Sequence, residues 1–255
     1  MPSTPHFPFP DTDDVAHITT AVADIALAPA EQPLRWHPDA WREAHWSAEV
    51  WRGSSDRFDK AGAALVRLHD GMVDETPTSI TLLQTVLWPR QPQVPAFIFM
   101  ASTSRMEEQE PISMLYTDLI RQHDEIPVAT HTAFTSALAQ ACSRHGESID
   151  DLQMYLQGRD MLGGCAAGCG VLYFFPQDRI EIMRALLGSA LTAYRDTLAR
   201  TPSPSAATTT YRHRQRIATW METEDYGFKV GRQNGIPAHI MQAYAFPPTP
   251  SENDI

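Results

Sequence analysis

Cysteine is scarce in this sequence of 255 residues, which contains only three. So small and odd a number cannot form a disulfide framework, and we expect a protein of a reducing compartment, the cytoplasm. Basic residues are also in deficit: 20 Lys and Arg stand against 31 Asp and Glu, for a net charge of −11. A general nucleic-acid binder needs a basic footprint, so the composition argues against that class.

Long apolar runs are missing as well. No stretch approaches the ~20 residues that cross a bilayer, so we expect no membrane partner. Residues 1–11 hold four prolines and no positive flank, which predicts a disordered segment rather than a signal peptide. Hydrophobic residues make up 43% of the chain, enough to bury a core. We expect one domain over residues 12–246, a disordered tail over 247–255, and a monomer or homodimer.

Short apolar stretches, bounded by Gly, Pro or polar clusters, predict most of the strands. They are rich in Ile, Leu, Val and aromatic residues and lie at 63–69, 80–88, 96–101, 112–119 and 171–175. Residues 39–51 fit either a helix capped by Asp39 or a strand over 46–51.

Apolar residues at spacings of three and four predict the helices. One begins after Asp11 as N-cap and carries Val15 and Ile18 on its apolar face. Others are expected at 130–145, 148–156, 178–200, 211–222 and 236–244. Because most strands are consecutive, these elements predict an α/β fold, with an antiparallel β-sheet sandwiched between α-helices.

The segment Cys165-Ala-Ala-Gly-Cys169 is a candidate metal or redox pair. Its three-residue gap differs from the two-residue gap of the usual zinc and thioredoxin motifs. We therefore favour a glycine-rich turn with small buried side chains and expect no metal.

Two carboxylates are candidates for acid–base chemistry. Asp118 begins the polar stretch DLIRQHDEIP, which also fits a solvated loop. Asp225 follows Glu222 and Glu224, and such an acidic run usually forms a solvated face. If one carboxyl group were buried beside a ligand, its pKa would rise and it could deliver a proton.

Arginines alternate along the segment YRHRQR, at Arg212, Arg214 and Arg216. They form either the solvated start of a helix or a cationic patch for the carboxylates of a ligand or an acidic partner.

Three segments together carry a resemblance to a known family. Residues 82–101 read LLQTVLWPRQPQVPAFIFMA, a strand that ends in Trp88-Pro89-Arg90 and restarts after a Val-Pro. This hairpin resembles the central hairpin of the ferredoxin-dependent bilin reductases. Residues 171–199 resemble that family's strand and long helix, and residues 211–246 resemble its C-terminal segment.

Parts of the chain also resemble the related aerobic coproporphyrinogen oxidases. These are FDKAG at 58–62 and PRQPQVP at 89–95. The two families, with the red chlorophyll catabolite reductases, share one fold: an antiparallel sheet between helices, with a tetrapyrrole on one face. The glycine-rich Gly-Gly-x-Asp-Leu-Thr-Pro run of the coproporphyrinogen oxidases is reduced here to Leu115-Tyr-Thr-Asp-Leu119.

The chain departs from the bilin reductases at two positions. The Asp that they carry on the second hairpin strand corresponds to Met100, and the His of some members falls near Gln84. The family's second carboxylate, in the C-terminal segment, matches Asp225. Proton donation would therefore rest on Asp225 or Asp118, unless the ligand is different.

The resemblance implies ferredoxin-dependent reduction of a linear tetrapyrrole (a bilin), with no tightly bound cofactor and with electrons from reduced ferredoxin. Gln84 would bind pyrrole groups, and Arg90, Arg212 and Arg216 would pair with propionates. Trp88, Phe97, Phe99 and the Met100 position would line the substrate. Two alternatives stay open: a coproporphyrinogen-oxidase-like enzyme acting on a cyclic tetrapyrrole, and a non-catalytic tetrapyrrole-binding protein.

Overall fold

The computed structural model describes residues 15–21, 34–91, 93–106, 109–122, 125–156, 161–176, 179–200 and 211–248. The expected disordered segment 1–11 lies outside the described residues, as does most of the expected tail over 247–255. None of the helices in the described ranges is both long enough and apolar enough to span a membrane.

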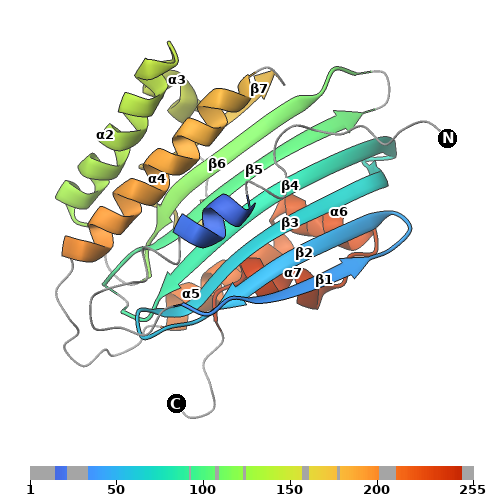
Figure 1. Cartoon of the computed structure of the whole chain (residues 1–255), viewed down its shortest axis with the longest axis horizontal. Coiled ribbons are helices and arrows are strands. Elements are labelled where there is room, and N and C mark those ends of the chain that lie inside the picture. Colours follow the sequence, from blue (N-terminus) through green and yellow to red (C-terminus); the bar gives the residue numbers. More distant parts are fainter. Residues whose placement is uncertain are drawn as a thin grey trace.

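Seven strands form one antiparallel sheet in which each strand pairs with the next along the chain (Figure 1). They are β1 (His37–Arg42), β2 (Trp46–Gly53), β3 (Phe58–Val73), β4 (Thr76–Pro89), β5 (Ala96–Met106), β6 (Ile112–Ile120) and β7 (Val171–Pro176). Short turns join the first six strands, as antiparallel neighbours allow. Before β7 the chain leaves the sheet to form two helices and a glycine-rich loop.

Helices cover both faces of this sheet, which confirms the predicted α/β sandwich. One face, which we call the α4 face, packs against α2 (Val128–Arg144), α3 (Ile149–Gln153), α4 (Ile180–Arg200) and a short helix over residues 15–21. The other, the α7 face, packs against α5 (Tyr211–Thr223), α6 (Tyr226–Gln233) and α7 (Ala238–Ala245). Two 3₁₀ turns, Met154–Leu156 and Met161–Gly164, flank the start of the glycine-rich loop.

Strand alternation divides the buried side chains between the two faces. In β4, Leu83 and Leu87 join the core under α4, whereas Val86 and Trp88 join the core under α7. A strand buried on both sides reads as a nearly continuous apolar run, which is why LLQTVLW carries little alternation in its sequence.

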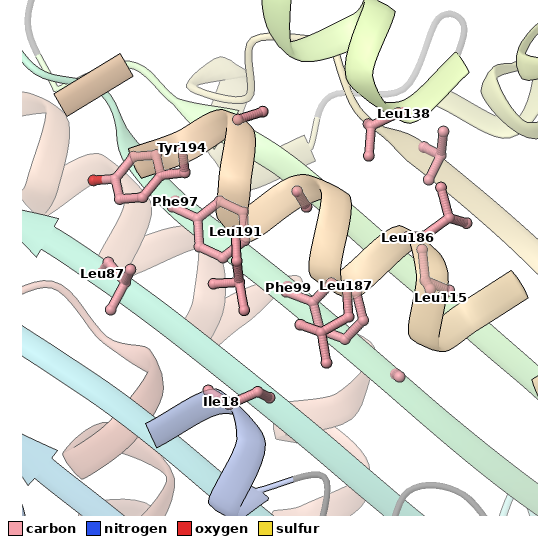
Figure 2. Close-up of a cluster of buried hydrophobic side chains, with 14 of the residues drawn as sticks. Ile18, Leu87, Phe97, Phe99, Leu115, Leu138, Leu186, Leu187, Leu191 and Tyr194 are labelled. Atoms are coloured by element: carbon pink, nitrogen blue, oxygen red, sulfur yellow. The ribbon is translucent and has the colours of Figure 1, made fainter. Parts of the chain in front are cut away.

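The core of the α4 face is built around aromatic contacts between the sheet and α4 (Figure 2). The ring of Phe97 stacks on that of Tyr194, with ring centroids 5.0 Å apart. The Tyr194 hydroxyl donates a hydrogen bond to the carbonyl oxygen of Pro95 at 3.0 Å. These contacts fasten the long helix to the middle of the sheet.

Of the two alternatives for residues 39–51, the strand over 46–51 is confirmed and the helix is not. Residues 39–51 form no helix; they contribute to the hairpin of β1 and β2, in which Trp41 pairs with Ala48. Alternate burial of Trp46, Ala48 and Val50 stabilises the strand there. The helix α6 was not predicted, because glycines interrupt its eight residues and hide the apolar spacing.

Candidate active site

A row of three side chains on the α7 face forms the floor of a cavity. Gln84 of β4 lies opposite Met100 of β5, and Met100 lies opposite Tyr116 of β6. All three line the cavity, together with Leu82 and Ile98. Because adjacent strands are about 4.8 Å apart, the backbone positions of Gln84 and Tyr116 are roughly 10 Å apart, with a thioether between them.

The C-terminal helices form the opposite wall. Trp220 and Met221 come from α5, Phe228 from α6, and Met241 and Tyr244 from α7. The remaining lining residues are Met161, Leu162, Asp225, Gly227, Ala245 and Phe246. The space between these residues, counted together with the open solvent at its mouth, is about 580 Å³. An apolar cavity with a few converging polar groups is the usual form of a small-molecule site.

Asp225 is the one carboxylate among these lining residues. It is the N-cap of α6: its Oδ1 accepts a hydrogen bond from the backbone N–H of Phe228 at 2.6 Å. Burial raises the pKa of this carboxyl group, against the opposing effects of the Phe228 N–H, Lys229 and the Gly227 N–H. A carboxyl group with a raised pKa in a cavity can hold and deliver a proton near neutral pH.

The two polar groups of the floor have no hydrogen-bond partner among the described residues. Tyr116 is 2% exposed, and its hydroxyl makes no hydrogen bond within the described part of the chain. Gln84 is 6% exposed, and no hydrogen bond joins its side-chain amide to another described residue. Buried polar groups are normally hydrogen-bonded, so both side chains are available to a ligand.

Asp118 does not line the cavity, although it is close to Tyr116 along β6. Its carboxylate is fully buried and accepts hydrogen bonds from the backbone N–H groups of Leu119, Gly168 and Cys169. The thiol of Cys169 also donates to it, at 3.2 Å. Burial raises the pKa of Asp118, and these hydrogen bonds oppose the rise. The group therefore holds the glycine-rich loop against the sheet.

The three aromatic residues predicted to line the substrate lie on two different faces of the sheet. Phe97 and Phe99 point to the α4 face, where they pack under α4 (Figure 2). Trp88 shares the α7 face with the cavity but is not among its lining residues. Alternation explains the correction, because neighbours such as Phe99 and Met100 cannot line the same face of a strand. Met100 is the predicted β5 residue that faces the cavity.

Two of the predicted arginines, Arg90 and Arg216, do not line the cavity wall. Arg90 is exposed and pairs with Asp59 at 3.4 Å, and Arg216 is exposed on α5. The side chain of Arg212 lies outside the described part of the chain. Arg214, in contrast, is buried: it pairs with Asp59 at 2.8 Å and donates hydrogen bonds to Gln122 and to the carbonyl oxygen of Pro89.

The predicted site residues that the structure brings together are thus Gln84, Met100 and Asp225. Sequence reasoning missed Tyr116, Tyr244 and Trp220, which line the same cavity. Tyr116 pairs with Met100 across β5 and β6, so the two side chains share a face of the sheet. The sequence indicates this face for Tyr116 only once the strand register is known. Nothing local in the sequence indicated which tyrosines of the C-terminal helices face the sheet.

Two of the three cysteines, Cys165 and Cys169, belong to the loop that Asp118 holds. Cys165 and Cys169 are free and buried, as is Cys142. Within the described ranges, no group of three His, Cys, Asp or Glu side chains is arranged to bind a metal. Gly170 is required in this loop, because a Cβ there would overlap the carbonyl oxygen of Thr117.

Comparison with known proteins adds one finding at the level of structure. Neither models of known families nor curated proteins match the chain. Among solved structures, phytochromobilin synthase from tomato, in complex with biliverdin, matches with a TM-score of 0.56 over 90% of this chain and 79% of that chain. The fold resembles that of a bilin reductase. Sequence identity is 12%, so the likeness shows a distant relationship of fold.

Proposed function

We propose that this protein binds a linear tetrapyrrole between the α7 face of the sheet and α5–α7. We propose further that it reduces the pigment with single electrons from a ferredoxin-like protein. The observation that carries the proposal is the position of Asp225, which lines the same apolar cavity as Gln84 and Tyr116. The match to a bilin reductase fold supports the class of ligand.

In this reaction the protein would deliver a proton and hold the pigment in a fixed position. Saturation of one double bond takes two electrons and two protons, and Asp225 would supply one of the protons. The conjugated pigment itself would accept the electrons, so the protein would need no bound cofactor of its own. Since the lining residues include no Lys or Arg, the propionates would extend to the open side of the cavity, toward solvent.

The first test is an anaerobic absorbance titration with biliverdin, followed by addition of reduced ferredoxin. We expect a shifted absorption spectrum on binding and a new product after the addition. Failure to bind biliverdin at tens of micromolar would overturn the proposal.

Asp225→Asn separates proton delivery from helix capping. The amide oxygen of Asn still accepts from the Phe228 N–H, so α6 keeps its cap. We expect biliverdin binding to persist and the rate of conversion to fall roughly 10²- to 10⁴-fold, the usual contribution of a general acid. Glu224→Gln, which changes an exposed acid outside the cavity, is the matched control and is expected to convert biliverdin normally.

The rate of biliverdin conversion is expected to decrease with rising pH. Because burial raises the pKa of Asp225, its protonated form persists to higher pH than that of an ordinary aspartate. The rate of conversion is expected to fall as pH rises through that pKa, and Asp225→Asn should lose this limb of the profile. An unchanged profile in the variant would assign the proton to another group.

A pigment carrier without turnover is the second candidate, and one observation favours it. The floor position opposite Gln84 is the thioether of Met100, so the sheet side of the cavity offers no carboxylate. Binding of biliverdin without conversion by reduced ferredoxin would support this carrier function.

A further inference from the structure

The hydroxyl of Tyr116 is an unpaired polar group at the floor of the cavity. The side chain is 2% exposed and lines the cavity, and its hydroxyl has no hydrogen-bond partner in the described part of the chain. Leaving a buried hydroxyl without a partner costs free energy of folding. An unsatisfied buried group needs an explanation, and a ligand that accepts its hydrogen bond is one.

Other groups near Tyr116 do not use this hydroxyl. Asp118, two residues away on β6, is already occupied by three backbone N–H groups and a thiol. Asp225 uses its Oδ1 to cap α6. The side chain next to Tyr116 across the sheet is Met100, whose thioether accepts hydrogen bonds only weakly.

The electrostatic surroundings make the phenol a donor. Burial raises the pKa of Tyr116 well above its ordinary value, and the charges of Asp118, Cys169 and Asp225 raise it further. The group therefore stays protonated across the physiological range. It can donate a hydrogen bond but does not act as a phenolate.

We propose that the Tyr116 hydroxyl donates a hydrogen bond to a carbonyl oxygen of the tetrapyrrole bound in this cavity. The inference rests on the proposed function and names one contact of that same site. Gln84 lies two strands away from Tyr116, with Met100 between them. These two polar side chains would suit a flat ligand that has polar groups along one edge.

Tyr116→Phe removes the hydroxyl and keeps the ring. We expect the Kd for biliverdin to rise about 2- to 12-fold and the absorption maximum of the bound pigment to move. Because the hydroxyl has no partner among the residues that the structure describes, the Tm without ligand should be unchanged or higher. The rise in Tm on adding biliverdin should shrink. A hydroxyl with a merely structural function would show the opposite, a lower Tm and an unchanged bound spectrum.

Tyr194→Phe is the matched control on the α4 face. Its hydroxyl is bonded to Pro95, so we expect a lower Tm and an unchanged Kd and bound spectrum. Tyr116→Met gives a second removal of the hydroxyl if the phenylalanine variant does not fold, and it should weaken binding as well.

The outcomes separate this inference from the proposed function. A wild-type protein that binds biliverdin, with a Tyr116→Phe variant of equal Kd and spectrum, overturns the inference alone. A wild-type protein that does not bind biliverdin overturns the proposed function and, with it, this inference.

Discussion

Lys60 brings an ammonium group into the contact between β3 and α7. Its Nζ donates hydrogen bonds to the carbonyl oxygens of Gln242 and Phe246, both at 2.7 Å. These carbonyls lie in the last turn of α7 and just beyond it, where a cation is favoured by the helix dipole. Burial, and secondly the charge of Arg52, lower the pKa of Lys60 to about 7.

The lowered pKa of Lys60 predicts stability that rises with pH. Between about 7 and 10.5 the unfolded chain binds a proton at this lysine that the folded protein does not. The free energy of unfolding of the wild type, minus that of Lys60→Met, should therefore increase across this window, by at most about 1.4 kcal/mol per pH unit. Urea unfolding of both proteins at pH 6.5, 7.5, 8.5 and 9.5 measures the difference. A flat difference, or one that falls with pH, would contradict the lowered pKa.

At the scale of elements, the start of β3 fastens the C-terminal helices over the cavity. In FDKAG, Phe58 fills the core of the α4 face, Asp59 pairs with Arg214 of α5, and Lys60 holds α7. Gly62 lets α7 approach, because a Cβ there would overlap the carbonyl oxygen of Tyr244. Four of the five residues of the motif thus have a packing or pairing function in this chain.

Gly62→Ala is expected to displace α7 from the sheet. The overlapping atoms belong to the backbone, so no side-chain rotation relieves the contact. Overpacking of this kind should lower the free energy of unfolding by about 1–3 kcal/mol and weaken biliverdin binding, since Met241 and Tyr244 line the cavity.

Gly188→Ala in α4 is the control for this helix contact. An added Cβ there meets no atom within 4 Å, and alanine favours the helix, so we expect an unfolding free energy equal to or about 1 kcal/mol above that of the wild type. Chemical denaturation and biliverdin titration of both variants measure the two effects. A Gly62→Ala protein as stable as the wild type would mean that α7 does not depend on this close approach.

At the scale of the whole molecule, the sheet separates the core of the α4 face from the cavity in which we propose that the pigment binds. Leu187 of α4 is 1% exposed in the core of the α4 face (Figure 2). The cavity lies on the opposite, α7 face. Leu187→Ala should lower the free energy of unfolding by about 2–5 kcal/mol. In the fraction that stays folded, we expect the Kd for biliverdin and the bound spectrum to match the wild type. A tenfold change in Kd would show that the two faces are coupled.

Much of the architecture could be predicted from the sequence, because the decisive patterns are local. The periodic apolar positions of α4 and the bounded apolar runs of β3–β7 follow from the alternation of side chains in helices and strands. The helix α6 could not be predicted in this way, since its start depends on a single cap by Asp225 and its body contains two glycines. The prediction that Asp225 is catalytic stays a prediction, now with a cavity around it.

The sandwich of helices and an antiparallel sheet could be predicted from the amino-acid sequence, because hydrophobic period and turn residues are properties of short segments. Which candidate residues meet depends on tertiary packing. Strand pairing placed Gln84, Met100 and Tyr116 in one row, and alternation turned Phe97 and Phe99 to the other face. Packing of α5–α7 then brought Asp225 to the same cavity, across more than a hundred residues of chain. Such contacts depend on register and close approach between distant segments, and no local pattern of residues encodes them.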